Sequence, residues 1–279
     1  MFEKVLISVG VISLVYFSFK VLSWALSSIS FFLEPGAKSI SVKLTEYESS
    51  DKLKGLPKFD PNRLVGESKK VFLWDPSTYD YFGEIPVSTP ADVKAVVDRA
   101  RIAQQKWKSS SFQTRRLLMK TLLKYITENQ ENCARVAVRE SGKTLLDAII
   151  GEVLVTCEKL VWLTNSGEQH LQKEVRESGR LMMMKRAYVE YIPLGVIGAI
   201  VPWNYPFHNV FNPVSAALFS GNAIVIKVSE YASWSIRYYK AIIDACLEAV
   251  GADKDLVQFV VGYVGIHACL CVSIYSHFM

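Results

Sequence analysis

Two short apolar runs, residues 194–201 and 223–228, dominate the hydrophobic pattern and are separated by a stretch of helix length. Each run is typical of a buried strand, and two strands that are joined through a helix lie parallel in one sheet. A third run at 256–263 follows an amphipathic helical stretch at 233–250. The pattern therefore predicts an α/β fold with three consecutive parallel strands, which is an incomplete, doubly wound sheet.

A helical layer is predicted to precede this sheet. Its first helix has strong start signals, because Thr89 and Asp92 form a capping-box pattern around Pro90. The order of elements, with a strand pair, then helices, then parallel strands, is that of one α/β domain. The other expected elements are paired strands at 71–74 and 79–85, helices at 114–127, 130–141 and 145–172, and a strand at 181–192.

The N-terminal segment is apolar, and between residues 5 and 33 only Lys20 is charged. A helix that crosses the hydrocarbon core needs about 20 apolar residues, so the segment predicts a single-pass membrane anchor, with Lys20 reaching an interface. The alternative is a cleavable signal peptide, because residues 5–19 have the length of its apolar core. Lysines are more frequent after the segment than before it, which favours a body that lies in the cytosol. The expected location of the anchored protein is the endomembrane system.

Polar side chains gather where the first two strands of the predicted sheet end. The sequence PWNYP at 202–206 follows the first strand, and Lys227 and Glu230 follow the second. An open α/β sheet binds ligands at the carboxyl ends of its strands. An amide such as that of Asn204 can hold an oxyanion, and a Lys and a Glu can contact ribose hydroxyls. Taken singly, Asn204 is more typical of a turn, and Lys227 with Glu230 of a solvated pair.

The order and spacing of these motifs resemble the aldehyde dehydrogenase family. In that family a strand ending in PWN(F/Y)P is followed by a helix, then GN, then a strand ending in KPSE. This chain has PWNYP at 202–206, GN at 221–222 and KVSE at 227–230, with Val228 in place of the usual Pro. The resemblance spans residues 70 to 263. Together with the apolar N-terminus, it points to the membrane-anchored, plant-type members (family 22).

The resemblance implies an oxidoreductase that uses NAD or NADP to convert an aldehyde to a carboxylic acid. Asn204 is implied to be catalytic, as the donor that holds the oxyanion of a covalent thiohemiacetal. Glu230 favours NAD, because a carboxylate near the ribose disfavours a 2′-phosphate. The strand at 181–192 is implied to serve homo-oligomerisation. Cofactor contacts are implied for Ile200, Val201, Pro202, Trp203, Lys227 and Glu230.

The family's nucleophilic Cys, its Glu general base and its Gly-rich loop all lie downstream of the KPSE-like strand. Residues 264–279 lack a Gly-rich helix start, and Cys269 and Cys271 lack the family's sequence context. We therefore expect an aberrant tail and an inactive, C-terminally truncated chain, for which the resemblance does not by itself imply cofactor binding. Without further cover, the apolar runs at 223–228 and 256–261 are expected to be exposed.

Composition excludes several other classes of function. The net charge of +5 is mild, and the basic residues form no stripe with interleaved aromatics, so nucleic acid is not expected as a partner. The five cysteines are odd in number and widely spaced, which excludes a disulfide framework. The four histidines have no metal-ligand spacing, so no metal site is expected.

The expected domain organisation has four parts. They are a transmembrane anchor at 1–33, a linker and lead-in at 34–70, the N-terminal part of a cofactor-binding domain at 71–263, and the tail at 264–279, with the catalytic domain missing. Two functions remain open. One is an anchored aldehyde dehydrogenase of which this chain is an incomplete record, and the other is a short non-catalytic membrane protein that associates with full-length family subunits.

Overall fold

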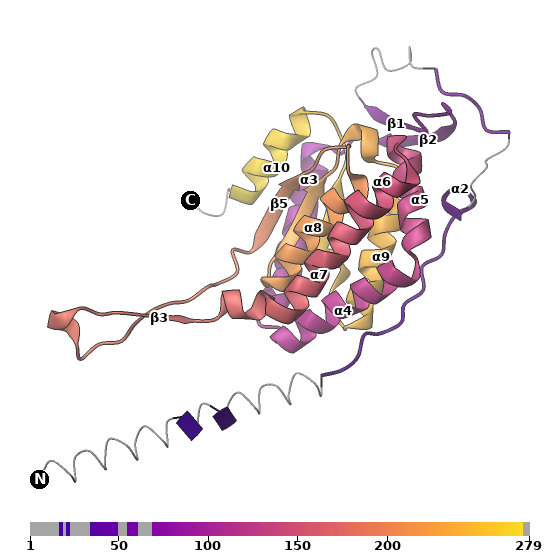
Figure 1. Ribbon diagram of the computed structural model, residues 1–279. Helices are drawn as coiled ribbons and strands as arrows, with labels where there is room; N and C mark the ends of the chain where they lie inside the picture. Colours follow the sequence, from indigo (N-terminus) through magenta and orange to yellow (C-terminus); the bar gives the residue numbers. More distant parts are fainter. Residues whose placement is uncertain (1–16, 19–20, 23–33, 50–54, 61–68, 276–279) are drawn as a thin grey trace, which may run out of the picture. The chain divides into compact units, whose positions relative to one another are not determined.

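The computed structural model describes residues 17–18, 21–22, 34–49, 55–60 and 69–275 (Figure 1). The chain divides into two compact units, residues 1–36 and 37–279. In the first unit, residues 17–18 and 21–22 have helical backbone. Most of the predicted anchor at 5–33, with its signal-peptide alternative, lies outside the described residues. Among the residues that are described, no helix combines the length and the apolar character needed to cross a membrane.

A three-stranded parallel sheet forms the centre of the second unit. Its strands follow the order β5 (Val196–Ile200), β6 (Ala223–Lys227) and β7 (Val257–Val260). Every residue of the central strand β6 is buried. The predicted parallel strands are therefore confirmed, although each is shorter than the apolar run that indicated it.

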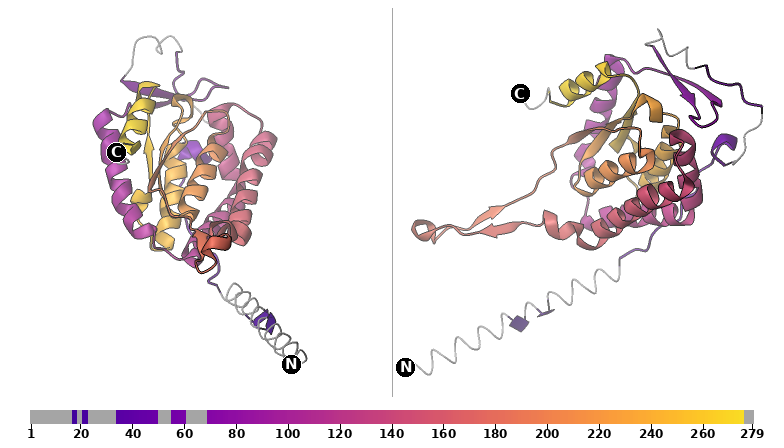
Figure 2. Two further views of the ribbon diagram at one scale, coloured as in Figure 1. Left: turned by 90° about the vertical axis from the view of Figure 1, so that its left-hand side faces the viewer. Right: turned by 45° about the horizontal axis from the view of Figure 1, so that its top comes forward.

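Helices cover both faces of this sheet. The left view of Figure 2 shows α3 (Pro90–Trp107) and α10 (Gly265–Tyr275) on one face, with α8 (Pro206–Phe219) and α9 (Ile236–Ala249) on the other. Three more helices pack onto α8 and α9 as an outer layer, namely α4 (Phe112–Glu128), α5 (Gln130–Ser141) and α7 (Val155–Ser166). The predicted helical layer before the sheet is therefore confirmed.

The start of α3 shows why the sequence predicted it well. The Thr89 side chain accepts a hydrogen bond from the Asp92 backbone N–H, and the Asp92 carboxylate accepts one from the Thr89 backbone N–H. This capping box satisfies donors that the first helical turn leaves open. Farther along, Trp107 donates from its indole nitrogen to the Leu218 carbonyl at 2.8 Å, which ties the end of α3 to α8.

One expectation about the end of the domain is wrong. The runs at 223–228 and 256–261 are buried, because helices cover both of their faces. Part of that cover comes from α10, a helix for which the sequence showed no start signal, whose Ile266 and Leu270 join the core. The exposed apolar side chains lie instead at β5, the edge strand of the described sheet. They are Ile200 at its end and Leu194 just before its start.

The prediction of a strand over residues 181–192 is also wrong, because the strand in this region, β4 (Ala187–Val189), is much shorter. A two-stranded antiparallel arm forms instead from β3 (Glu174–Arg176) and β4, with a 3-10 turn, η4 (Arg180–Met182), between them. The right view of Figure 2 shows this arm projecting from the body. Leu181 and Met184 near its tip are 99% and 98% exposed, so the methionine run pairs with no strand among the described residues.

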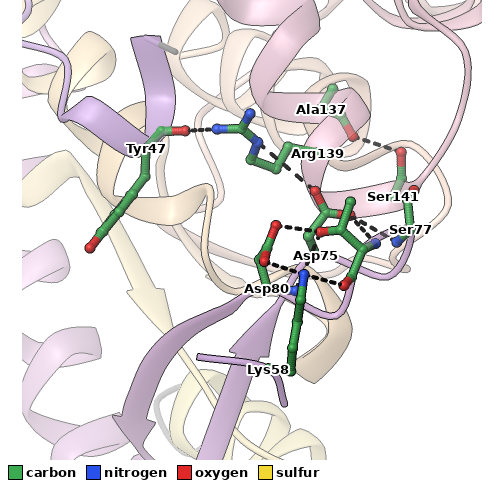
Figure 3. A network of polar contacts seen from close by, with 9 residues as sticks. Tyr47, Lys58, Asp75, Ser77, Asp80, Ala137, Arg139 and Ser141 are labelled. Carbon is green, nitrogen blue, oxygen red and sulfur yellow. Dashed lines mark hydrogen bonds and ion pairs between the residues drawn. The ribbon is translucent and has the colours of Figure 1, made fainter. Parts of the chain in front are cut away.

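A hairpin of β1 (Lys70–Trp74) and β2 (Tyr81–Pro86) packs near the end of α5 (Figure 3). In its turn, the Asp75 carboxylate accepts from the Ser77 backbone N–H at 2.8 Å, and Arg139 of α5 lies 4.0 Å from the same carboxylate. Lys58 pairs with Asp80 at 2.7 Å, and its hydrogen bond lowers the pKa of Asp80. Of these contacts, the one between Asp75 and Arg139 joins the hairpin to the C-terminal end of α5.

The long helix predicted at 145–172 is interrupted. It begins as α6 (Leu145–Ala148), passes through a π-helical segment, η2 (Ile149–Leu154), and continues as α7. Such π-helical turns are rare and occur mostly at functional sites. The remaining short elements are α2 (Glu46–Ser49) and the 3-10 turns η3 (Gly167–Leu171), η5 (Glu230–Ala232) and η6 (Lys254–Leu256).

Candidate functional site

The PWNYP turn lies at the carboxyl end of β5 and leads directly into α8. Ile200, the last residue of β5, is the register partner of Lys227, the last residue of β6. One residue later, the Val201 N–H donates to the Lys227 carbonyl at 3.0 Å. The structure therefore brings the turn at 202–206 next to Lys227, as the sequence pattern predicted.

Asn204 is exposed at the tip of this turn. The side-chain nitrogen of Asn209 donates to the Pro202 carbonyl at 3.2 Å and to the Asn204 side-chain oxygen at 3.4 Å. The Asn204 side-chain oxygen is thus held by Asn209, and the Asn204 side-chain N–H groups donate to no group among the described residues. Trp203 beside it is 51% exposed. The turn therefore offers a hydrogen-bond donor and an aromatic face to a ligand.

Lys227 and Glu230 form a pair that differs from a solvated surface pair. Lys227 is buried, and its ammonium lies 3.7 Å from the Glu230 carboxylate. Burial lowers the pKa of Lys227, and Glu230 partly opposes this shift. Glu230 itself is half-buried at the start of η5. The pair presents one donor and one acceptor at the end of β6.

A pocket of about 270 Å³ opens beside these residues. Glu140, at the end of α5, is buried in its wall and accepts a hydrogen bond from the Ser235 N–H at 3.0 Å. The other Glu140 oxygen has no hydrogen-bond partner in the described part of the chain. Burial raises the pKa of Glu140 to about 7. Much of the lining is aromatic, with Trp74, Trp203, Tyr231 and Trp234 beside Glu140 and Glu230.

The groups at the strand ends fit a nucleotide. The Lys227 amine and the Glu230 carboxylate suit ribose hydroxyls as donor and acceptor. His267, in the first turn of α10, is near enough to Lys227 and Glu230 to interact with both, although burial is the main reason for its lowered pKa. Its Nε2 atom is buried without a hydrogen-bond partner among the described residues. Within the same residues, no three His, Cys, Asp or Glu side chains could hold a metal ion.

Three of the described cysteines are poorly suited to act as a nucleophile at this site. Burial raises the pKa of Cys133 and Cys246 to about 12 and that of Cys157 to about 11. A thiol with so high a pKa supplies little thiolate. Cys271 is exposed, but it lines an apolar groove between β5 and α10 with Leu194 and Ile197.

The sequence pattern did not indicate two charged residues behind the turn, Lys143 and Glu152. The Lys143 ammonium donates to the Asn204 backbone carbonyl at 2.7 Å and to the Glu152 carboxylate at 2.6 Å. No pattern marks Glu152, because a π-helical segment breaks the helical spacing that would place it.

Comparisons with known proteins agree with this arrangement. The family model for the aldehyde dehydrogenase family matches residues 65–272. An aldehyde dehydrogenase-like protein of Saccharomyces cerevisiae is 47% identical over 186 residues, which cover 66% of this chain and 29% of the relative. The chain therefore spans less than a third of the length of that curated relative.

Solved structures show the same fold. An aldehyde dehydrogenase of Mycobacterium tuberculosis complexed with NAD+ has a TM-score of 0.64 at 24% identity, covering 74% of this chain and 41% of that chain. A glyceraldehyde-3-phosphate dehydrogenase of Methanocaldococcus jannaschii complexed with NADP has a TM-score of 0.63 at 21% identity, covering 71% and 42%. Since the family model also matches most of its length, the chain belongs to the aldehyde dehydrogenase family.

Proposed function

We propose that this chain carries the cofactor side of the active site of a membrane-anchored aldehyde dehydrogenase, which oxidises an aldehyde to a carboxylic acid with NAD or NADP. The observation that carries the proposal is the register of Ile200 with Lys227. This register places the turn that holds Asn204 beside the Lys227–Glu230 pair. Ligands of open α/β sheets bind at this edge.

Each residue has a distinct role in the proposal. The exposed Asn204 amide donates a hydrogen bond to the oxyanion that develops on the substrate. Lys227 donates to the adenosine ribose and Glu230 accepts from it, which favours NAD over NADP. When bound, the dinucleotide accepts the hydride that leaves the substrate. The nicotinamide side is lined by Ile200, Val201, Pro202 and Trp203.

We further propose that the chain by itself is inactive as an aldehyde dehydrogenase. The raised pKa values of Cys133, Cys157 and Cys246 support this. The full chain in detergent should produce no NADH from aldehydes above a blank, while an active aldehyde dehydrogenase added to the same mixture should. Turnover that disappears in Cys269→Ala or Cys271→Ala would show that the tail supplies the nucleophile.

The domain organisation that we propose matches this function. Residues 1–33 contain the single-pass anchor of an endomembrane protein, 34–70 form the lead-in, and 71–263 form the N-terminal part of the cofactor domain in the cytosol. Residues 264–279 contribute α10, and the family match extends into them as far as residue 272. The anchor is supported by the presence of one charged residue, Lys20, between 5 and 33.

A second function is favoured by the exposed arm of β3 and β4. Leu181 and Met184 near its tip are almost fully exposed, which is unusual for large apolar side chains. The chain would then be a non-catalytic membrane protein whose arm binds full-length family subunits. Co-purification with a full-length subunit should fall in a Leu181→Asp, Met184→Asp variant, and should persist in a control that alters exposed Ile102 on α3. Equal recovery of both variants would contradict this function.

A further inference from the structure

We propose that Lys143, Glu152 and Asn209 form a positioning set that fixes both the backbone and the side chain of Asn204. The inference rests on the proposed role of Asn204 as an oxyanion donor. Such a donor acts by preorganisation, since its geometry must be set before charge develops on the substrate. Asn204 lies on an exposed turn, so neighbouring elements must supply that order.

Lys143 contacts the turn at two consecutive residues, at the backbone of Asn204 and at the side chain of Tyr205. Its ammonium donates to the Asn204 carbonyl at 2.7 Å and lies 3.9 Å from the centre of the Tyr205 ring. The Lys143 side chain is 10% exposed, although its hydrogen bond to Asn204 lies at the surface of the turn. The hydrogen bond is charge-assisted, and the ammonium over the ring is a cation–π contact.

Glu152 joins the same ammonium to the start of α8. One of its carboxylate oxygens is 2.6 Å from the Lys143 nitrogen. The other accepts from the Phe207 N–H at 2.7 Å and from the His208 N–H at 3.2 Å. These two donors belong to the first turn of the helix that follows the PWNYP turn, where backbone N–H groups lack helical partners. The carboxylate therefore fixes the residues just after Asn204, as Lys143 fixes Asn204 itself.

The π-helical segment η2 explains how Glu152 reaches this place. Glu152 is fully buried within it, and Gly151 lies against the aromatic ring of Tyr205. A Cβ atom at Gly151 would lie 3.0 Å from the nearest ring carbon, so only glycine allows this close approach without a shift. The π-helical geometry thus turns a glycine and a carboxylate together toward the turn, which agrees with the common occurrence of such segments at functional sites.

Asn209 sets the side chain rather than the backbone. It lies one turn into α8 and donates to both the Pro202 carbonyl and the Asn204 side-chain oxygen. An amide carries its acceptor on the oxygen and its donors on the nitrogen. Holding the oxygen therefore fixes how the Asn204 amide is turned, and with it the position of its N–H groups.

The test uses the full chain in detergent, labelled with nitrogen-15 at asparagine, and follows the side-chain amide signal of Asn204. Lys143→Met and Asn209→Leu should each shift or broaden this signal, and Lys143→Arg should restore most of it. Two controls should leave it unchanged. Asn212→Leu alters a neighbouring asparagine whose backbone carbonyl accepts from Ser215, and Lys240→Met breaks an ion pair of 2.6 Å with Asp244 on α9.

Hydrogen exchange of the Phe207 and His208 amides gives a second readout. It should be about tenfold faster in Glu152→Leu, which removes the acceptor, and close to wild type in Glu152→Gln, which keeps an oxygen. If Glu152→Leu or Lys143→Met fails to fold, Asn209→Leu, which changes a half-buried side chain, still tests whether the Asn204 amide signal depends on its neighbours.

Two outcomes would overturn the proposal. One is an Asn204 signal that stays the same in folded Lys143→Met and Asn209→Leu. The other is a lower melting temperature in these variants without any change at Asn204, because that would indicate a role in stability alone. Both signals are read without nucleotide or aldehyde. An absence of nucleotide binding would therefore contradict the proposed function while leaving this inference separately testable.

Discussion

At the scale of single residues, Glu140 is a carboxylate held in an unfavourable electrostatic environment. It is buried, one of its oxygens lacks a hydrogen-bond partner in the described structure, and its pKa rises from 4.5 to about 7. Between these two pH values the folded chain keeps a proton that the unfolded chain has lost. Stability should therefore fall as the pH rises from 4.5 toward 7, and the full cost should remain at higher pH.

Glu140→Gln should remove that cost, because glutamine is neutral and its oxygen can still accept from the Ser235 N–H. The variant should be more stable than wild type at pH 8 by up to about 3 kcal/mol, with little difference near pH 4.5. Urea unfolding at the two pH values measures this. Glu84→Gln, at an exposed ion pair, serves as the control. Equal effects of Glu140→Gln at both pH values would contradict the burial argument.

The sequence could predict some residues of the site but not others. Asn204, Lys227 and Glu230 belong to a linear motif at strand ends, so order and spacing were enough to place them together. Lys143 and Glu152 reach the same turn from a distant helix and through a π-helical segment. No local pattern encodes such a contact, because it depends on how α5 ends and how α7 packs against α8.

At the scale of elements, packing requires a glycine at position 167, at the end of α7, although glycine has a low helix propensity. A Cβ atom there would lie 2.7 Å from the ring of Phe219, which is buried in the core. Gly167→Ala should therefore destabilise the fold by about 1–3 kcal/mol, although alanine favours helices. Gly265→Ala, where the structure leaves open space, should be neutral or slightly stabilising. Thermal unfolding of both variants distinguishes clash from propensity.

Helix α10 is the element on which sequence and structure differ most. Leu270 is 1% exposed against the sheet, whereas Val272 is 68% exposed. Leu270→Ala should cost about 2–5 kcal/mol of unfolding free energy, and Val272→Ala should have little effect. If Leu270→Ala unfolds at the same denaturant concentration as wild type, α10 does not pack as described.

The elements that the sequence predicts well are marked by the residues within them or directly beside them. Strands β5, β6 and β7 are continuous apolar runs, and α3 carries a complete capping box. The arm and α10 were missed because apolar residues alone do not distinguish a strand from an exposed arm or a covering helix. Their conformation depends on contacts with distant parts of the chain.

At the scale of the whole molecule, the N-terminal anchor is a direct prediction. A reporter fused after Gly36 should resist carbonate extraction and keep its N-terminus, because residues 5–33 hold a single charge. Replacing two apolar residues of this segment with Lys should release the fusion. Recovery of a soluble protein that starts near Ser28 would identify the segment as a cleaved signal peptide.

The central claim is that the ends of β5 and β6 form a nucleotide-binding edge, and NMR titration of the full chain with NAD+ tests it most directly. At about 10 mM nucleotide, even a site with a Kd of about 1 mM is mostly filled, so weak binding suffices. Amide signals of Trp203, Asn204, Lys227 and Glu230 should shift together, and those of the exposed arm should not. Saturating NAD+ that shifts none of these four residues, or shifts only residues elsewhere, would contradict the account.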